Sequence, residues 1–210
     1  PDYPVTVFFT REGYFKKITP QSLRMSSEQK LKEGDRVAVQ TESTNNVELL
    51  FFSDRGQVYK TFAYEFDDTK ASVLGDYIPA KLGFDEGEKV AGMVVAADFS
   101  GYVLFFFENG KAAKVPLASY QTKTKRKKLA NAYSMASPLV ALYHAQESAE
   151  FMLISSNTRR LLFNSAMIAP KATRDSQGVA VMTQKKNCRL EKVTPYTEGG
   201  LANPHRYRTK

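Results

Sequence analysis

The sequence predicts an all-β fold of about four four-stranded blades, arranged like the blades of a propeller. One phrase occurs four times: an apolar run, a short polar turn and a second β-prone run. The copies occupy residues 6–17, 49–62, 102–114 and 151–163. Their turn positions, residues 13, 56, 110 and 158, are 43, 54 and 48 residues apart, and a four-stranded blade takes about 40–50 residues. No stretch shows a sustained 3.6-residue apolar period, so we expect little helix. The alternative architecture is two stacked β-sandwiches.

Each copy of the phrase predicts a β-hairpin. In the central copy, Leu49–Phe52 leads into the turn Ser53-Asp54-Arg55-Gly56, and Val58–Phe62 leads out of it. Ser and Asp favour tight turns, and a glycine at the turn position can adopt the positive φ that closes a short loop. In the fourth copy Thr158 replaces this glycine. We expect Asn157 to supply the left-handed residue there, because Asn tolerates that region better than most residues.

A loop of variable length follows each hairpin and leads into a further strand. The steps Glu33-Gly34-Asp35 and Glu86-Gly87-Glu88 introduce this strand in the first two copies. In the third copy we expect the strand at 138–142, and in the fourth at 178–182 and 187–190. The predicted repeats are 5–46, 47–100, 101–148 and 149–195. Together they form one domain, residues 1–195, followed by a C-terminal tail, residues 196–210.

Composition limits the classes of partner and compartment. A net charge of +8 and a pI near 9.4 indicate a polyanionic partner, with nucleic acid the usual one and an anionic membrane surface second. The single cysteine, Cys188, excludes an internal disulfide. The longest apolar run, 102–107, is too short to cross a bilayer, and the N-terminus has no signal-peptide pattern. A start without Met inside a strand-like phrase indicates a piece of a longer polypeptide, and we expect a cytoplasmic protein.

Residues that could carry catalysis are sparse. Two histidines and one cysteine are too few for a tetrahedral Cys/His zinc site. No Gly-rich phosphate loop and no Gly-x-Ser-x-Gly elbow is present. We interpret His144 as an ordinary strand residue, and the acidic pairs 67–68 and 85–86 as parts of polar turns. We therefore expect no enzymatic activity, no metal and no cofactor.

Basic residues recur at one place in the repeated phrase. The fourth residue after the turn position is Lys17, Lys60 or Lys114 in three copies, while the fourth copy has Arg159 and Arg160 earlier on its strand. Repeated from blade to blade, such residues would form a curved cationic track suited to a phosphate backbone. The alternative is an ordinary solvated face.

The densest positive cluster is a segment that we call the basic loop: Lys123, Lys125, Arg126, Lys127 and Lys128. Five like charges so close together repel one another and stay solvated unless a polyanion neutralises them. The alternative is a run that only aids solubility. The residues predicted to bind a nucleic-acid backbone, which the resemblance described below specifies as DNA, are Lys16, Lys17, Lys60, Lys114, Lys123, Lys125, Arg126, Lys127, Lys128, Arg159 and Arg160.

The repeats resemble those of the C-terminal domain of the bacterial type IIA topoisomerase A subunit, found in DNA gyrase and topoisomerase IV. The phrases that carry the resemblance are Leu-Phe-Phe-Ser-Asp-Arg-Gly-Gln-Val-Tyr at 50–59, Gly-Tyr-Phe-Lys-Lys at 13–17, Ser-Gln-Gly-Val at 176–179 and the two Glu-Gly-acid steps. The resemblance covers about residues 5–193. It implies a β-pinwheel, in which neighbouring blades exchange strands, and a basic rim that binds and bends duplex DNA.

The resemblance also implies a set of partners and a division of labour. The partners would be duplex DNA, the ATPase B subunit and the remainder of the A subunit, in the bacterial nucleoid. The nucleophilic tyrosine of the family lies in another part of the protein, so none of the eleven tyrosines here takes that role. A rival interpretation from another class is a propeller-like platform whose basic rim binds an acidic protein.

One departure from the gyrase pattern concerns the box Gln-Arg-Arg-Gly-Gly-Lys-Gly that follows a hairpin in gyrase-type domains. Residues 24–30 do not match it, and residues 121–128 keep its charge but contain no glycine. Without glycine the backbone cannot approach a phosphate as closely. This favours a domain of the topoisomerase IV type, or a degenerate paralogue, over gyrase-type wrapping of DNA.

Overall fold

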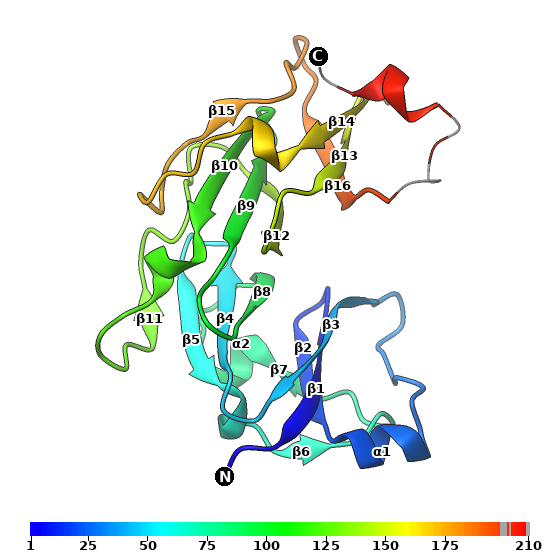
Figure 1. The fold of residues 1–210 in the computed structure, drawn as a ribbon, viewed down its shortest axis with the longest axis vertical. Coiled ribbons are helices and arrows are strands. Elements are labelled where there is room, and N and C mark those ends of the chain that lie inside the picture. Colours follow the sequence, from blue (N-terminus) through cyan, green and yellow to red (C-terminus); the bar gives the residue numbers. More distant parts are fainter. Residues whose placement is uncertain (198–200, 202, 209–210) are drawn as a thin grey trace. The chain divides into compact units, whose positions relative to one another are not determined.

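The computed structural model describes residues 1–197, 201 and 203–208, and it consists of strands joined by loops and a few short helical turns (Figure 1). The chain forms two compact units. The first contains Pro1–Asp98 and Thr122–Ala130, and the second contains Phe99–Gln121 and the described residues from Asn131 onward. The basic loop therefore packs in the first compact unit, although the strands on either side of it in the sequence belong to the second.

The first compact unit holds two sheets. The strands of one are β1 (Pro4–Thr10), β2 (Tyr14–Ile18), β3 (Val37–Thr44), β6 (Asp68–Thr69) and β7 (Asp76–Tyr77), in the order β3-β1-β2-β6 with β7 also pairing with β2. The strands of the other are β4 (Glu48–Ser53), β5 (Val58–Phe62), β8 (Val90–Ala96) and β11 (Lys128–Leu129), in the order β11-β5-β4-β8.

The second compact unit also holds two sheets. One has the order β12-β9-β10-β15, with strands β9 (Tyr102–Phe107), β10 (Lys111–Pro116), β12 (Leu139–Ala145) and β15 (Val179–Ala180). The other has the order β14-β13-β16, with strands β13 (Glu150–Ser155), β14 (Arg160–Asn164) and β16 (Leu190–Pro195). Four sheets, one for each repeat, confirm the all-β prediction and exclude the two-sandwich alternative.

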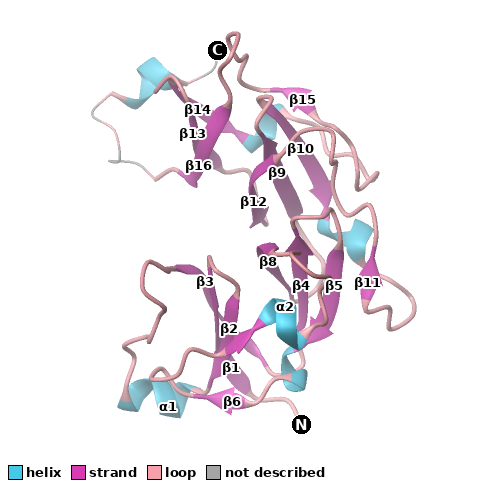
Figure 2. Cartoon of the chain, turned by 180° about the vertical axis from the view of Figure 1, so that it is seen from behind, coloured by secondary structure: helices cyan, strands magenta, loops and turns pink. Residues whose placement is uncertain are grey.

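Helix is confined to short segments in the described residues, as expected. They are α1 (Pro20–Met25), α2 (Ile78–Lys81) and the 3₁₀ turns η1 (Ala63–Glu65), η2 (Leu117–Tyr120), η3 (Ser165–Met167) and η4 (Pro204–Tyr207). None of the described helices is long and apolar enough to cross a membrane. Figure 2 shows the chain from behind, with the short helical segments in cyan and the strands in magenta.

The four predicted hairpins are present, each in a sheet of its own. Gly13, Gly56 and Gly110 all have positive φ, as the turns require. In the fourth turn the left-handed residue is Thr158, with φ of 67°, so the expectation for Asn157 was wrong. The side-chain oxygen of Asn157 accepts a hydrogen bond from the Arg159 amide at 3.2 Å. This bond stabilises Asn157 in the position that precedes the left-handed Thr158.

The outermost strands are exchanged between repeats. The loop of the second repeat supplies β6 and β7 to β2, the loop of the third supplies β11 to β5, and the loop of the fourth supplies β15 to β10 (Figure 1). This exchange is the β-pinwheel connectivity that the resemblance implies. It also covers the outer edges of the first three hairpins, which would otherwise expose unpaired backbone groups.

Each compact unit has its own aromatic core. In the first, the ring centroids of Phe15 and Phe66 lie 4.5 Å apart, and Phe51 packs edge-on to Phe15 at 5.8 Å. In the second, Phe106 lies 5.3 Å from Phe151 and 6.1 Å from Phe163. Because both faces of the central strands are covered, their sequences form continuous apolar runs instead of alternating ones.

Part of the expected C-terminal tail packs against the fourth sheet. Arg208 forms a parallel bridge with Leu162 of β14, and its guanidinium donates two hydrogen bonds of 2.9 Å to the Glu150 carboxylate. Gly199 and Gly200, which also belong to the expected tail, lie outside the described residues.

Candidate nucleic-acid interface

Three of the four predicted DNA-binding lysines on the hairpin strands lie in the interior. Lys16 and Lys17 are each 2% exposed and Lys60 is 6% exposed. Burying an ammonium group is unfavourable unless protein atoms replace its water. The structure supplies such atoms at all three positions.

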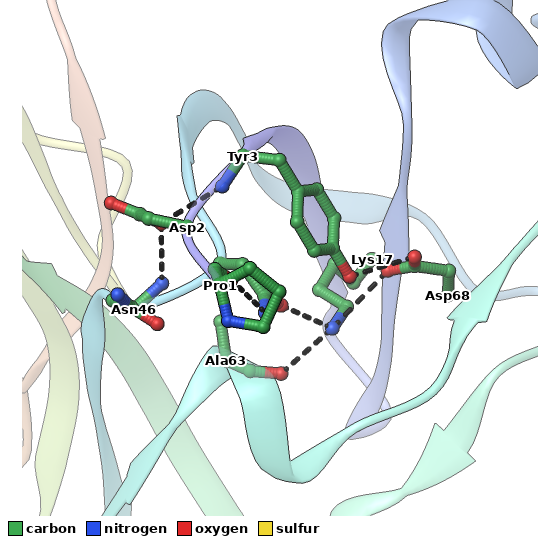
Figure 3. Close-up of polar contacts among 8 residues, drawn as sticks. Pro1, Asp2, Tyr3, Lys17, Asn46, Ala63 and Asp68 are labelled. Atoms are coloured by element: carbon green, nitrogen blue, oxygen red, sulfur yellow. Dashed lines mark hydrogen bonds and ion pairs between the residues drawn. The ribbon is translucent and has the colours of Figure 1, made fainter.

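Lys17 is held between its own hairpin and the segment donated by the second repeat (Figure 3). Its ammonium group donates to the Asn45 carboxamide at 2.6 Å and to the Ala63 carbonyl at 3.1 Å, and it lies 3.2 Å from a carboxylate oxygen of Asp68. Asp68 also accepts a hydrogen bond of 2.7 Å from the Tyr3 hydroxyl, and this bond raises the pKa of Tyr3. No hydrogen of Lys17 is left over for a phosphate.

Lys16 and Lys60 have similar surroundings. The Lys16 ammonium donates to the carbonyls of Val73 at 2.7 Å and Ala71 at 3.1 Å, and burial lowers its pKa. The Lys60 ammonium donates to the Thr122 hydroxyl at 2.9 Å and lies 3.7 Å from the Glu48 carboxylate. Burial raises the pKa of Glu48, although Lys60 acts in the opposite direction.

Lys114 is half-buried in the third hairpin. It donates to the Ser165 carbonyl at 3.2 Å, and its ammonium lies 4.6 Å from the centre of the Tyr102 ring. The prediction of an exposed track is therefore wrong for Lys17 and Lys60, and Lys16, another predicted DNA-binding residue, is buried as well. The strands that carry these side chains are covered on both faces. Their ammonium groups therefore form hydrogen bonds with segments of the same or the next repeat and join the hairpin to them.

All five cationic side chains of the basic loop are exposed. The loop is more ordered than the sequence predicts, because its last residue, Lys128, begins the exchanged strand β11 and pairs with Tyr59. The Lys60 amide also donates to the Lys127 carbonyl at 2.8 Å. The backbone at Lys127 and Lys128 is thus fixed on the edge of β5, while the five charged groups are exposed.

Two aromatic rings lie under the basic loop. The Lys128 ammonium is 5.3 Å from the centre of the Tyr59 ring, and the Lys125 ammonium is 6.0 Å from that of Phe62. The Tyr59 hydroxyl donates to the Glu88 carboxylate at 2.7 Å, and burial together with this bond raises the pKa of Tyr59. Burial would raise the pKa of Glu88, but hydrogen bonds led by those from Ser53 and Tyr59 lower it overall.

A cleft of about 410 Å³ opens beside β11. Its lining residues are Tyr59, Lys60, Thr61, Glu65, Lys81, Leu82, Gly83, Lys127 and Lys128. Cationic side chains outnumber acidic ones there by four to one, so the cleft attracts anions. Lys81 was missed in the sequence analysis because it comes from α2, in a loop that carries no repeat signal.

The two remaining predicted residues, Arg159 and Arg160, lie on the fourth hairpin, in the second compact unit. Arg159 and Arg160 are both exposed. Arg159 donates one hydrogen bond to the Thr183 carbonyl at 3.0 Å, which leaves part of its guanidinium facing solvent.

The residues that the structure describes include no group of His, Cys, Asp and Glu side chains that could hold a metal ion. His144 lies in β12, as expected of a strand residue, and its Nε2 is 3.0 Å from the Ser100 carbonyl. The acidic pair 67–68 contributes Asp68 to the Lys17 contact described above.

Comparisons with known proteins agree with this architecture. The model of the family described as "DNA gyrase C-terminal domain, beta-propeller" matches residues 48–97. The chain is 30% identical over 127 residues to the A subunit of DNA gyrase from Streptomyces coelicolor, covering 56% of this chain and 15% of that protein. It is 27% identical over 129 residues to the A subunit of DNA topoisomerase 4 from Bacillus subtilis, covering 60% of this chain and 16% of that protein.

A solved structure extends the match to almost the whole chain. The C-terminal domain of DNA topoisomerase IV superposes with a TM-score of 0.79 at 24% identity, covering 94% of this chain and 62% of that one. At this identity the match shows the fold. The chain spans only about a sixth of the length of the two curated relatives. Sequence and fold together confirm the predicted resemblance: this chain is similar to the C-terminal domains of the A subunits of DNA gyrase and topoisomerase IV.

Proposed function

We propose that this chain is the duplex-DNA-binding domain of a topoisomerase IV or gyrase A subunit. It would bind DNA without sequence preference, bend it and so steer strand passage. The observation that carries the proposal is the basic loop, which exposes five cations and whose last residue, Lys128, pairs with β5. Closely spaced cations neutralise adjacent phosphates and release condensed counterions, and this release drives non-specific binding.

The buried strand lysines change which residues contact DNA under this proposal. The contacts fall to the basic loop, to Lys81 beside it and to Arg159 and Arg160 on the fourth hairpin. All of these side chains are exposed. Phosphate contacts of this kind fix the position of a duplex and carry no sequence information.

The names of the relatives support a place in a larger enzyme. The partners would be duplex DNA, the ATPase B subunit and the remainder of the A subunit. The domain itself would cleave no strand. Its contribution would be to hold and bend one DNA segment while other parts of the enzyme perform the chemistry.

The experiment is duplex binding measured by fluorescence anisotropy across a salt series. Replacing Lys123, Lys125, Arg126, Lys127 and Lys128 together with Gln should weaken binding by about two or more orders of magnitude at low salt. It should flatten the log–log salt slope by up to about 4–5, since each lost phosphate contact removes about 0.9. A bending assay by energy transfer between the ends of a short duplex would follow the same variants.

The matched control removes five exposed charges elsewhere: Lys70, Lys171, Lys185, Lys186 and Lys192, each replaced with Gln. If the two variants weaken binding equally, net charge and not the basic loop drives the interaction. A salt slope near zero in the parent protein would contradict DNA binding through phosphates and favour an acidic protein as partner.

A further inference from the structure

A second cleft in the first compact unit lies at the turn of the first hairpin, where β7 and the start of β8 meet it. Its volume is about 530 Å³, and we call it the aromatic cleft. Its lining residues are Arg11, Glu12, Tyr14, Lys32, Tyr77, Lys89 and Val90. None of them belongs to the basic loop or to the cleft beside β11, so the proposed duplex site does not account for it.

The walls of the aromatic cleft are fixed by backbone hydrogen bonds. The Ile78 amide donates to the Gly13 carbonyl at 2.9 Å, and Tyr14 pairs with Tyr77 across β2 and β7 (Figure 1). The Arg11 amide donates to the Arg36 carbonyl at 3.0 Å. A cavity whose frame is already ordered binds a ligand without a large ordering penalty.

The charge of the aromatic cleft is positive. Its lining includes three cations, Arg11, Lys32 and Lys89, and one carboxylate, that of Glu12. Across the residues that the structure describes, no carboxylate lies within ion-pair distance of these three cations. Three cations without ion-pair partners around one cavity form a site for an anion.

The aromatic component is a pair of tyrosines. The rings of Tyr14 and Tyr77 lie 5.2 Å apart at an angle of 43°, and the Lys32 ammonium is 5.9 Å from the centre of the Tyr14 ring. Tyr77 is 41% exposed, unlike the phenylalanines of the core. An exposed ring beside cations is the combination that binds a base and its phosphate together.

We propose that the aromatic cleft binds an unpaired nucleotide of a DNA strand. The base stacks on the exposed ring of Tyr77, and the flanking phosphates lie against Arg11, Lys32 and Lys89. The cavity volume falls within the range of small-ligand sites, roughly 300–1,000 Å³, so one nucleotide fits and a duplex does not. In an intact duplex the faces of the bases are stacked on one another, and therefore only a frayed, gapped or single-stranded segment can supply the occupant.

A free nucleotide carries the same chemistry as an unpaired nucleotide in a strand. The test therefore compares labelled ten-residue oligothymidylate with thymidine monophosphate as ligands of the 210-residue chain. Replacing Tyr77 with Ala should weaken oligothymidylate binding by about 5- to 100-fold, the range for loss of one stacked base, while Tyr77→Phe retains most of the affinity. The control is Tyr64→Ala, because Tyr64 is similarly exposed, at 45%, and stacks on Phe62 outside the aromatic cleft.

A spectroscopic readout separates stacking from general loss of charge. A 2-aminopurine base placed in the oligonucleotide should be quenched on binding to the parent and to Tyr77→Phe, and less so by Tyr77→Ala. Equal losses for Tyr77→Ala and Tyr64→Ala, or unchanged binding by Tyr77→Ala, would overturn the proposal. Monophosphate binding as tight as oligothymidylate binding, and equally sensitive to Tyr77, would overturn the assignment to a DNA strand and give the cleft to a free nucleotide.

Failure here is distinguishable from failure of the proposed function. Tyr77→Ala should leave duplex affinity unchanged, and the five-residue basic-loop variant should retain quenching of the 2-aminopurine base. If the basic-loop variant loses duplex binding but keeps quenching, the duplex site is the basic loop. If Tyr77→Ala loses quenching but keeps duplex binding, the site for the unpaired nucleotide is the aromatic cleft.

Discussion

Replacing Lys17 with Met tests whether the recurrent strand lysine is structural. Met keeps the length of the side chain but donates no hydrogen bond, so Asn45 and the Ala63 carbonyl would lose a charged donor inside the protein. Hydrogen bonds to charged groups contribute about 1.5–3 kcal/mol each. The Asp68 contact adds less than about 1 kcal/mol because the Asp68 side chain is 39% exposed and screened by water. The apolar contacts of Met and the removal of a buried charge offset part of the loss. We therefore expect the free energy of unfolding to fall by about 2–4 kcal/mol.

Urea unfolding followed by far-UV circular dichroism measures this change, and duplex affinity of the folded protein is measured beside it. Lys70→Met is the control, because Lys70 is exposed on the segment that follows Asp68, and it should change stability by less than about 0.5 kcal/mol. The structural role of Lys17 requires lower stability with unchanged duplex affinity at low temperature. Unchanged stability with weaker, less salt-dependent DNA binding would refute it and restore the cationic track.

Two further substitutions test the turn geometry and the buried carboxylate. Gly110 and Gly34 have the same φ of 81°, but a Cβ on Gly110 would lie 1.9 Å from the Met182 carbonyl oxygen, whereas one on Gly34 meets no atom within 4 Å. Gly34→Ala should cost about 1–2 kcal/mol of stability through backbone strain, and Gly110→Ala should cost at least about 2 kcal/mol more. Equal melting temperatures for these two variants would contradict the close approach. The pKa of Glu88 is lowered from its usual value of 4.5, so its ionised form stabilises the fold above that pH, and the contribution is lost as the pH falls below it. The free energy of unfolding of Glu88→Gln, measured in urea, should therefore fall less between pH 7 and pH 4 than that of the parent. Equal decreases in the two proteins would show that ionised Glu88 does not stabilise the fold.

The local pattern of the sequence was enough to predict the hairpins. Each turn is bounded by apolar runs within about fifteen residues, so short-range chemistry determines where it lies. The role of Lys17 could not be predicted in this way, because its acceptors come from residues 45, 63 and 68, and pairing across repeats leaves no local trace. One signal was available: Lys16 and Lys17 stand between Phe15 and Ile18 in a strand without polar alternation. That pattern is typical of a strand covered on both faces, where a lysine needs internal acceptors.

The basic loop shows the reverse case. Its charge was evident in the sequence, and the exposure of its side chains follows from that charge. The pairing of the basic loop with β5 could not be predicted from the sequence. Only Lys128 and Leu129 form the exchanged strand, and two residues are too few for a recognisable strand pattern. The aromatic cleft escaped prediction because Tyr14 and Tyr77 come from different repeats.

The exchange of outer strands has a consequence for how such a chain is synthesised. A hairpin such as β4–β5 is complete only when residue 128, some seventy positions later, has been made and has docked. Sheets with contacts at such separations form slowly and leave edges open in the meantime. The outer edge of each of the first three hairpins is therefore covered only by a segment of the repeat that follows it. At the fourth hairpin the corresponding edge is that of β14, and there Arg208 bridges to Leu162.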